Sequence, residues 1–127
     1  MSSEYLNLSG NFLQGTIPGS LGRLKNLREL HLGKNHLTGN FPNTMEYLVH
    51  LERVSVMLTK IGGTIPSEFG DWENLRYLDL SQNKLEGTIP LELFNCTKLN
   101  EIRLNFNSLT GTIPTNINQL QNLKRCK

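Results

Sequence analysis

The chain has 127 residues, a length typical of one domain, and 37% of its residues are hydrophobic. Thirteen lysines and arginines against eleven acids leave a net charge of +2, too small to indicate a nucleic acid or an anionic membrane as the partner. No apolar run approaches the roughly 20 residues that span a bilayer, so we expect no direct membrane insertion by this segment. Two cysteines, Cys96 and Cys126, are too few for a disulfide framework or a four-ligand zinc site, and we expect no cofactor and no metal.

The sequence repeats every 24 residues, with no insertion or deletion between repeats. The repeats begin near residues 3, 27, 51, 75 and 99, and a partial sixth begins at 123. Leucine opens each of them except the first, and all five prolines stand at position 16 of a repeat. One repeat cannot bury its own leucines, whereas stacked repeats share a continuous core. The sequence therefore predicts a single solenoid domain over residues 1–127.

Each repeat predicts the same elements in the same order. Positions 4 and 6 are apolar and positions 3, 5 and 7 are polar in most repeats, which indicates a short strand with one buried face. Position 13 is always glycine, which permits a positive φ or a close approach of two backbones. Proline at position 16 imposes an extended conformation on the residue before it. Segments such as residues 20–24 and 92–94 then suit a short helical or 3-10 turn that closes the coil.

Position 9 is the expected structural ladder. A buried asparagine there offers two donors and an acceptor to backbone groups where the chain leaves the strand. Threonine replaces it in the third repeat, at Thr59. The ladder residues are Asn11, Asn35, Asn83 and Asn107.

The segment from Leu75 to Pro90 reads LRYLDLSQNKLEGTIP and resembles the plant-type leucine-rich repeat, L-x-x-L-x-L-x-x-N-x-L-x-G-x-I-P. The resemblance extends over residues 3–127 and implies an α/β solenoid. Such a solenoid is a right-handed superhelix with a parallel inner sheet, a second short strand near the Gly-x-Ile-Pro segment, and 3-10 or helical turns on the outer side. The cysteine-paired caps usual at both ends of this family are missing, so we expect the chain to be part of a longer ectodomain.

Equal positions of successive repeats lie side by side in such a solenoid, so the exposed rows of the concave face define the candidate site. Charges alternate in sign along positions 2 and 3, which favours a self-neutralising ladder over a charged ligand groove. Met57, Leu58 and Phe106 are apolar where the period predicts exposure, and such residues mark a partner site or a local irregularity of the third repeat. The expected ligand contacts are His31, Arg53, Met57, Leu58, Tyr77, Asp79, Gln82, Arg103 and Phe106.

Other chemistry-bearing residues are interpreted as structural. Position 5 contains His31, Ser55 and Asp79, but a catalytic triad needs the histidine between the other two, so we expect no enzyme activity. Trp72, Cys96 and Cys126 occupy apolar positions and are expected in the core. Asn95 and, less favourably, Asn7 begin tripeptides that match the glycosylation pattern.

The resemblance implies a protein- or peptide-binding module of a plant receptor-like kinase or receptor-like protein, with a ligand or a co-receptor of the same repeat class as its partner. An inhibitor resembling the polygalacturonase-inhibiting proteins and a purely structural spacer remain alternatives. The family is found at the cell surface, although residues 1–4 lack the basic start and apolar stretch of a signal peptide.

Overall fold

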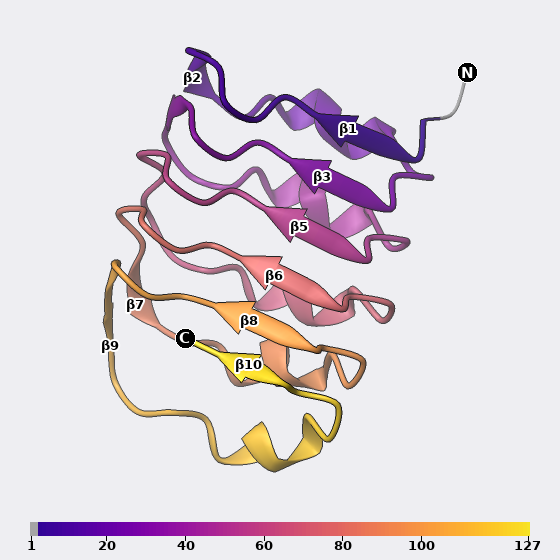
Figure 1. Ribbon diagram of the computed structural model, residues 1–127, viewed down its shortest axis with the longest axis vertical. Coiled ribbons are helices and arrows are strands. Elements are labelled where there is room, and N and C mark those ends of the chain that lie inside the picture. Colours follow the sequence, from indigo (N-terminus) through magenta and orange to yellow (C-terminus); the bar gives the residue numbers. More distant parts are fainter. Residues whose placement is uncertain (1–2) are drawn as a thin grey trace.

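The computed structural model describes residues 3–127 as a stack of coils, and residues 1 and 2 of the expected domain lie outside this range. One strand of each coil joins a parallel sheet of six strands, called the main sheet below (Figure 1). Its register pairs residues 24 apart, such as Leu30 with Val54 and Val54 with Leu78, which confirms the stacking expected from the repeat. The strands in spatial order are β1 (Tyr5–Asn7), β3 (Glu29–His31), β5 (Arg53–Ser55), β6 (Tyr77–Asp79), β8 (Glu101–Arg103) and β10 (Arg125–Cys126).

A second set of short strands follows the loops at the carboxyl ends of the main strands, where the resemblance predicted it. These strands are β2 (Gln14–Thr16), β4 (His36–Thr38), β7 (Glu86–Thr88) and β9 (Ser108–Thr110), paired as β2–β4 and β7–β9. The third coil contributes only the bridge from Thr64 to Glu86. Threonine methyl groups lie against glycines of the next coil: a Cβ on Gly39 would be 2.7 Å from Cγ2 of Thr16. Glycine at position 13 therefore serves both its positive φ and this close approach.

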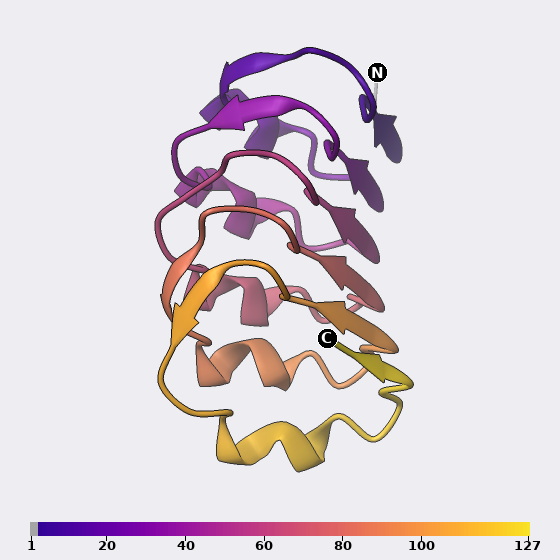
Figure 2. The same cartoon turned by 60° about the vertical axis from the view of Figure 1, so that its left-hand side comes forward.

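Five 3-10 turns close the coils on the side opposite the main sheet (Figure 2). Each turn begins directly after the position-16 proline, whose extended backbone leads into it. The turns are η1 (Gly19–Arg23), η2 (Asn43–Tyr47), η3 (Ser67–Asp71), η4 (Leu91–Asn95) and η5 (Thr115–Gln119). Together with the parallel sheet they confirm the solenoid class.

The core runs through the centre of the stack, between the main sheet and the turns. Leu27, Leu51, Leu75 and Leu99, which open four repeats, are all fully buried. An aromatic cluster widens the core around the third coil, where Phe69 stacks on Trp72 at 4.1 Å and contacts Phe41 edge-on at 5.3 Å. The indole N–H donates to the carbonyl of Met45 at 3.2 Å, so burial of this ring leaves no polar atom without a partner.

The two cysteines differ. Cys96 is buried as expected, and burial raises the pKa of its thiol to about 12. Cys126 is exposed, so the expectation that it lies in the core is wrong. It belongs to β10, the outermost strand of the main sheet, and within the described residues no further coil packs over it.

Candidate functional site

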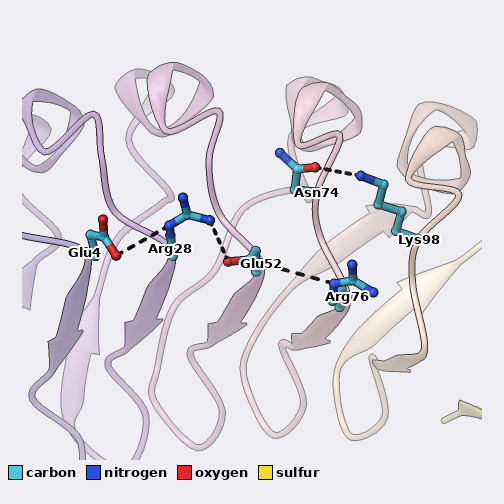
Figure 3. A network of polar contacts seen from close by, with 6 residues as sticks. All are labelled: Glu4, Arg28, Glu52, Asn74, Arg76 and Lys98. Carbon is cyan, nitrogen blue, oxygen red and sulfur yellow. Dashed lines mark hydrogen bonds and ion pairs between the residues drawn. The ribbon is translucent and has the colours of Figure 1, made fainter.

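The solvent side of the main sheet, called the sheet face, is edged by an ion-pair ladder at position 2 (Figure 3). Arg28 lies between two acids, with Nε 3.5 Å from Glu4 and Nη1 3.2 Å from Glu52. Arg76 approaches Glu52 at 4.0 Å, so the alternating charges pair across four coils. The ladder predicted from the alternating signs is confirmed for this row, and it leaves little free charge there. Exposed pairs of this kind contribute about 0–1 kcal/mol each.

The centre of the sheet face is a connected group of polar side chains from β5 and β6. The Arg53 guanidinium lies 4.7 Å from the centroid of the Tyr77 ring, a cation–π contact. The Tyr77 hydroxyl donates to Oδ2 of Asp79 at 3.2 Å, and the hydroxyl and N–H of Ser81 donate to Oδ1 at 2.6 and 3.0 Å. Burial, followed by the charge of Asp79, raises the pKa of Tyr77, which keeps this hydroxyl a donor.

Asp79 is not on the surface. Only 1% of the residue is exposed, although the period places position 5 on the solvent side of the strand. The Tyr77 hydroxyl and Ser81, both from the same coil, donate to its carboxylate. Asp79 thus anchors the Tyr77 hydroxyl rather than facing solvent. Its burial does not follow from its position in the repeat, because Asn7 makes the same bonds to Ser9 in the first coil while exposed.

A histidine–carboxylate contact and an ion pair flank the centre. His31 Nε2 lies 3.1 Å from a carboxylate oxygen of Glu29, and Arg103 Nε lies 2.7 Å from Glu101. The bond to Glu101 raises the pKa of Arg103. Within residues 3–127 no ion pair engages Arg53, so its guanidinium retains unused hydrogen-bond donors.

Position 8, at the carboxyl ends of the main strands, has a left-handed backbone in every complete coil. The residues there after Gly10 have φ angles between 55° and 59°. Leu58 is 45% exposed and Phe106 is 75% exposed, so both present apolar surface to solvent. The position-8 residues are Gly10, Lys34, Leu58, Gln82 and Phe106.

Met57 differs from its neighbour Leu58. It is half-buried over the backbone of Gly33, where a Cβ would lie 3.0 Å from Cγ of Met57. The third coil thus combines both interpretations of its apolar pair: Met57 tucks locally, and Leu58 remains a surface residue. Sequence reasoning missed a further aromatic contact at this edge, where the exposed Phe12 ring stacks on His36 with centroids 6.0 Å apart.

The asparagines of position 9 join neighbouring coils. The Asn35 amide donates to the carbonyl of Leu8 in the preceding coil at 2.9 Å, and its oxygen accepts the N–H of Leu13. Asn83 and Asn107 donate back to Val56 and Leu80 in the same way, whereas Asn11 bonds only within its own coil. These bonds fix the loops that carry position 8.

The expected ligand residues thus lie on one face but in two zones. His31, Arg53, Tyr77 and Arg103 form the central rows, with Asp79 beneath them. Leu58, Gln82 and Phe106 form the strand-end row, with Met57 between the zones. Among residues 3–127 no group of three or more His, Cys, Asp or Glu side chains could hold a metal ion. No helix in the described part of the chain is long and apolar enough to cross a bilayer.

Comparison with known proteins assigns a family to this arrangement. A family model described as Leucine rich repeat matches residues 4–61 and 49–109. Receptor-like protein 31 of Arabidopsis thaliana is 43% identical over 53 residues, which make up 42% of this chain and 6% of that protein. The structural neighbours include the plant peptide hormone receptor RGFR1 in complex with RGF2, with a TM-score of 0.92 and 39% identity over 94% of this chain and 19% of that one.

A chain of the BIR3–SERK2 complex from Arabidopsis thaliana is a further neighbour, with a TM-score of 0.85 and 33% identity over 94% of this chain and 66% of that one. The chain therefore spans less than two thirds of the length of each of these relatives. Parallel strands in 24-residue register, the asparagine bonds between coils and the family match agree. The chain belongs to the leucine-rich repeat family.

Proposed function

We propose that the chain is a non-enzymatic recognition module that binds a peptide or protein ligand, or a co-receptor of the same repeat class, through its sheet face. In this proposal it forms part of a plant cell-surface receptor, either a receptor-like kinase or a receptor-like protein, and it lies on the outer side of the membrane. The similarity to Receptor-like protein 31 and to a peptide hormone receptor supports this assignment.

The observation that carries the proposal is which charged side chains of the sheet face form ion pairs and which do not. Position 2 neutralises itself through ion pairs, whereas Arg53 is exposed and held over Tyr77 without an acidic partner. Asp79 accepts the hydrogen bond of the Tyr77 hydroxyl and is itself held by Ser81, so the Arg53–Tyr77 pair is preorganised. A rigid aromatic ring with a guanidinium that retains free donors is typical of binding hot spots.

The test is selection of a phage-displayed library of linear peptides on the chain, followed by affinity measurements on two charge-reversal variants. Arg53→Glu alters the centre of the sheet face, and Lys25→Glu makes the same charge change on an exposed residue just after turn η1. We expect the selected peptides to bind Arg53→Glu at least tenfold more weakly and Lys25→Glu with unchanged affinity. Peptides that bind Arg53→Glu as tightly as the unaltered chain would contradict the proposal and favour the structural spacer.

Export to the cell surface would make one further residue available for glycosylation. Asn95 is exposed at the last residue of η4, away from the sheet face, and we propose that it carries a glycan there. Asn7 is the weaker acceptor because its amide oxygen already bonds Ser9 and its nitrogen bonds Tyr5. Expression in a eukaryotic secretory system should give a glycosidase-sensitive mass shift that Asn95→Gln removes; a shift that persists in this variant would place the glycan elsewhere.

A further inference from the structure

We infer that the strand-end strip, formed by Lys34, Leu58, Lys60, Lys84 and Phe106, binds an acidic segment of the ligand that carries two apolar side chains. The strip lies where the main strands end and the loops to the second strands begin. This inference rests on the proposed binding function and specifies the chemistry of the partner. It concerns a zone separate from the Arg53–Tyr77 pair.

Two residues of the strip adopt a backbone conformation that is strained for their side chains. Leu58 and Phe106 have φ angles of 55° and 59°, in the left-handed region that side chains with a Cβ adopt reluctantly. The first coil has Gly10 at the equivalent place, with φ 71°. Leu58 and Phe106 keep 45% and 75% of their surface exposed, so burial offsets little of this strain. Backbone strain that burial of the side chain does not offset indicates a binding role.

The strip also carries unpaired positive charge. Lys34, Lys60 and Lys84 are exposed, and within residues 3–127 none of them forms an ion pair. The acids of the sheet face are instead engaged by their own partners, as Glu52 is by Arg28. Glu86 is the acid nearest in sequence to the strip. Three lysines against this one acid leave a net positive charge next to apolar surface, which favours a partner with acidic side chains.

The two apolar residues of the strip are spaced to suit an extended peptide. The N–H of Leu58 donates to the carbonyl of Ser81 at 3.0 Å, and the N–H of Gln82 donates to the carbonyl of Asn105 at 2.9 Å, which holds the loops side by side. Neighbouring strands lie about 4.8 Å apart, so Leu58 and Phe106, two coils apart, are separated by roughly 10 Å. One turn of a polyproline II helix advances about 9 Å in three residues. An extended segment crossing the coils would thus place apolar side chains i and i+3 on these two residues.

The strain premise is tested by urea denaturation of Leu58→Gly and Phe106→Gly, with Gln82→Gly as the matched control. Gln82 has the same backbone, with φ 57°, so its replacement relieves the same strain without removing apolar surface. We expect none of the three midpoints to fall below that of the unaltered chain. A clear fall for Leu58→Gly or Phe106→Gly would show that these side chains support the fold, and it would overturn the inference.

The partner chemistry is tested with two fluorescent peptides that carry leucine at positions i and i+3 and either glutamate or lysine at the remaining positions. Fluorescence anisotropy should show the glutamate peptide binding at least tenfold more tightly, with an affinity that falls as salt is raised. Leu58→Gly and Phe106→Gly should each weaken it at least fivefold. Leu91→Gly, which removes an exposed leucine from turn η4, should not. The double variant Lys60→Glu, Lys84→Glu should reverse the preference.

Equal binding of the two peptides, no binding of either, or unchanged affinity in the glycine variants would overturn the inference. These failures are distinguishable from failure of the proposed function. If library-selected peptides lose affinity for Arg53→Glu while the strip variants bind them normally, the sheet face is a binding site and only the strip is excluded.

Discussion

Thr59 shows what one asparagine contributes to a coil. Asn35 donates to three carbonyls, two in its own coil and one in the preceding coil, whereas the Thr59 hydroxyl contacts one carbonyl and the amide oxygen of Asn83. Asn83 also accepts the N–H of Thr59, so it compensates from the next coil for the missing asparagine. The side chain of Asn83 therefore has more hydrogen-bond partners than that of Asn35.

Asn83→Ala should lower the free energy of unfolding by about 2–4 kcal/mol, because it leaves buried backbone groups without partners. The carbonyls of Val56, Leu80 and Ser81 and the N–H of Thr59 lose their bonds to this side chain. Asn11→Ala is the matched control and should change it by less than about 1 kcal/mol, because Asn11 is exposed to water. Urea denaturation measures both, and equal losses would contradict the role assigned to bonds between coils.

The thiol of Cys96 makes stability depend on pH. Burial, and secondarily Asp71, raises its pKa from 9.0 to about 12. The unfolded chain ionises this thiol above about pH 9 while the folded chain retains the proton, so the stabilisation is complete below pH 9 and is lost as pH rises towards 12. Midpoints of urea unfolding at about pH 7 and about pH 10 should therefore differ less in Cys96→Ala than in Cys126→Ser. The same pH-dependent loss in both variants would show that Cys96 does not titrate in this way.

At the scale of the element, the 3-10 turns are packed edge to edge. A Cβ on Gly70 in η3 would overlap the carbonyl oxygen of Glu92 in η4, and a Cβ on Gly22 in η1 would lie 2.6 Å from the carbonyl oxygen of Thr44 in η2. Two backbones can approach this closely only where one of them has no side chain. Glycine inside these turns is thus set by the neighbouring coil.

Gly70→Ala should destabilise the chain by about 1–3 kcal/mol, because the backbone of η4 must move to admit the methyl group. Gly19→Ala in η1 is the control: its Cβ would lie 3.7 Å from the Thr44 hydroxyl oxygen, an ordinary contact. That variant should be unchanged or slightly more stable, since alanine restricts the unfolded chain. Thermal denaturation compares the two, and a tolerant Gly70 would mean that the turns are packed less tightly than described.

The period of 24 predicts the elements well because each repeat meets the same neighbours. Strands at positions 3–5 and turns after each proline follow from alternation and from the fixed φ of proline. The left-handed backbone of Leu58 and Phe106 could not be predicted, because loop geometry overrides the preference of these residues. The burial of Asp79 depends on the Tyr77 side chain folding over it, which no alternation pattern encodes.

At the scale of the whole molecule, the strands and turns of each coil among residues 3–127 pack only against those of the coils before and after it. The main sheet therefore runs along one side of the stack and the turns along the other (Figure 2). Position-2 ion pairs and position-9 asparagines hold successive coils in register, while Arg53, Tyr77 and the strand-end strip remain available. Equal positions of successive coils are thus spaced by one strand width, about 4.8 Å, along the stack.

The most direct measurement of this account is amide hydrogen exchange of the full chain, followed by mass spectrometry, with and without a library-selected peptide at saturating concentration. If the ligand binds the sheet face, bound peptide will slow exchange in segments covering β5 and β6 and in the loops after them, and will leave η2, η3 and η4 unchanged. Slowed exchange confined to the turns, with the strands unaffected, would place recognition on the opposite side and contradict the proposed binding face.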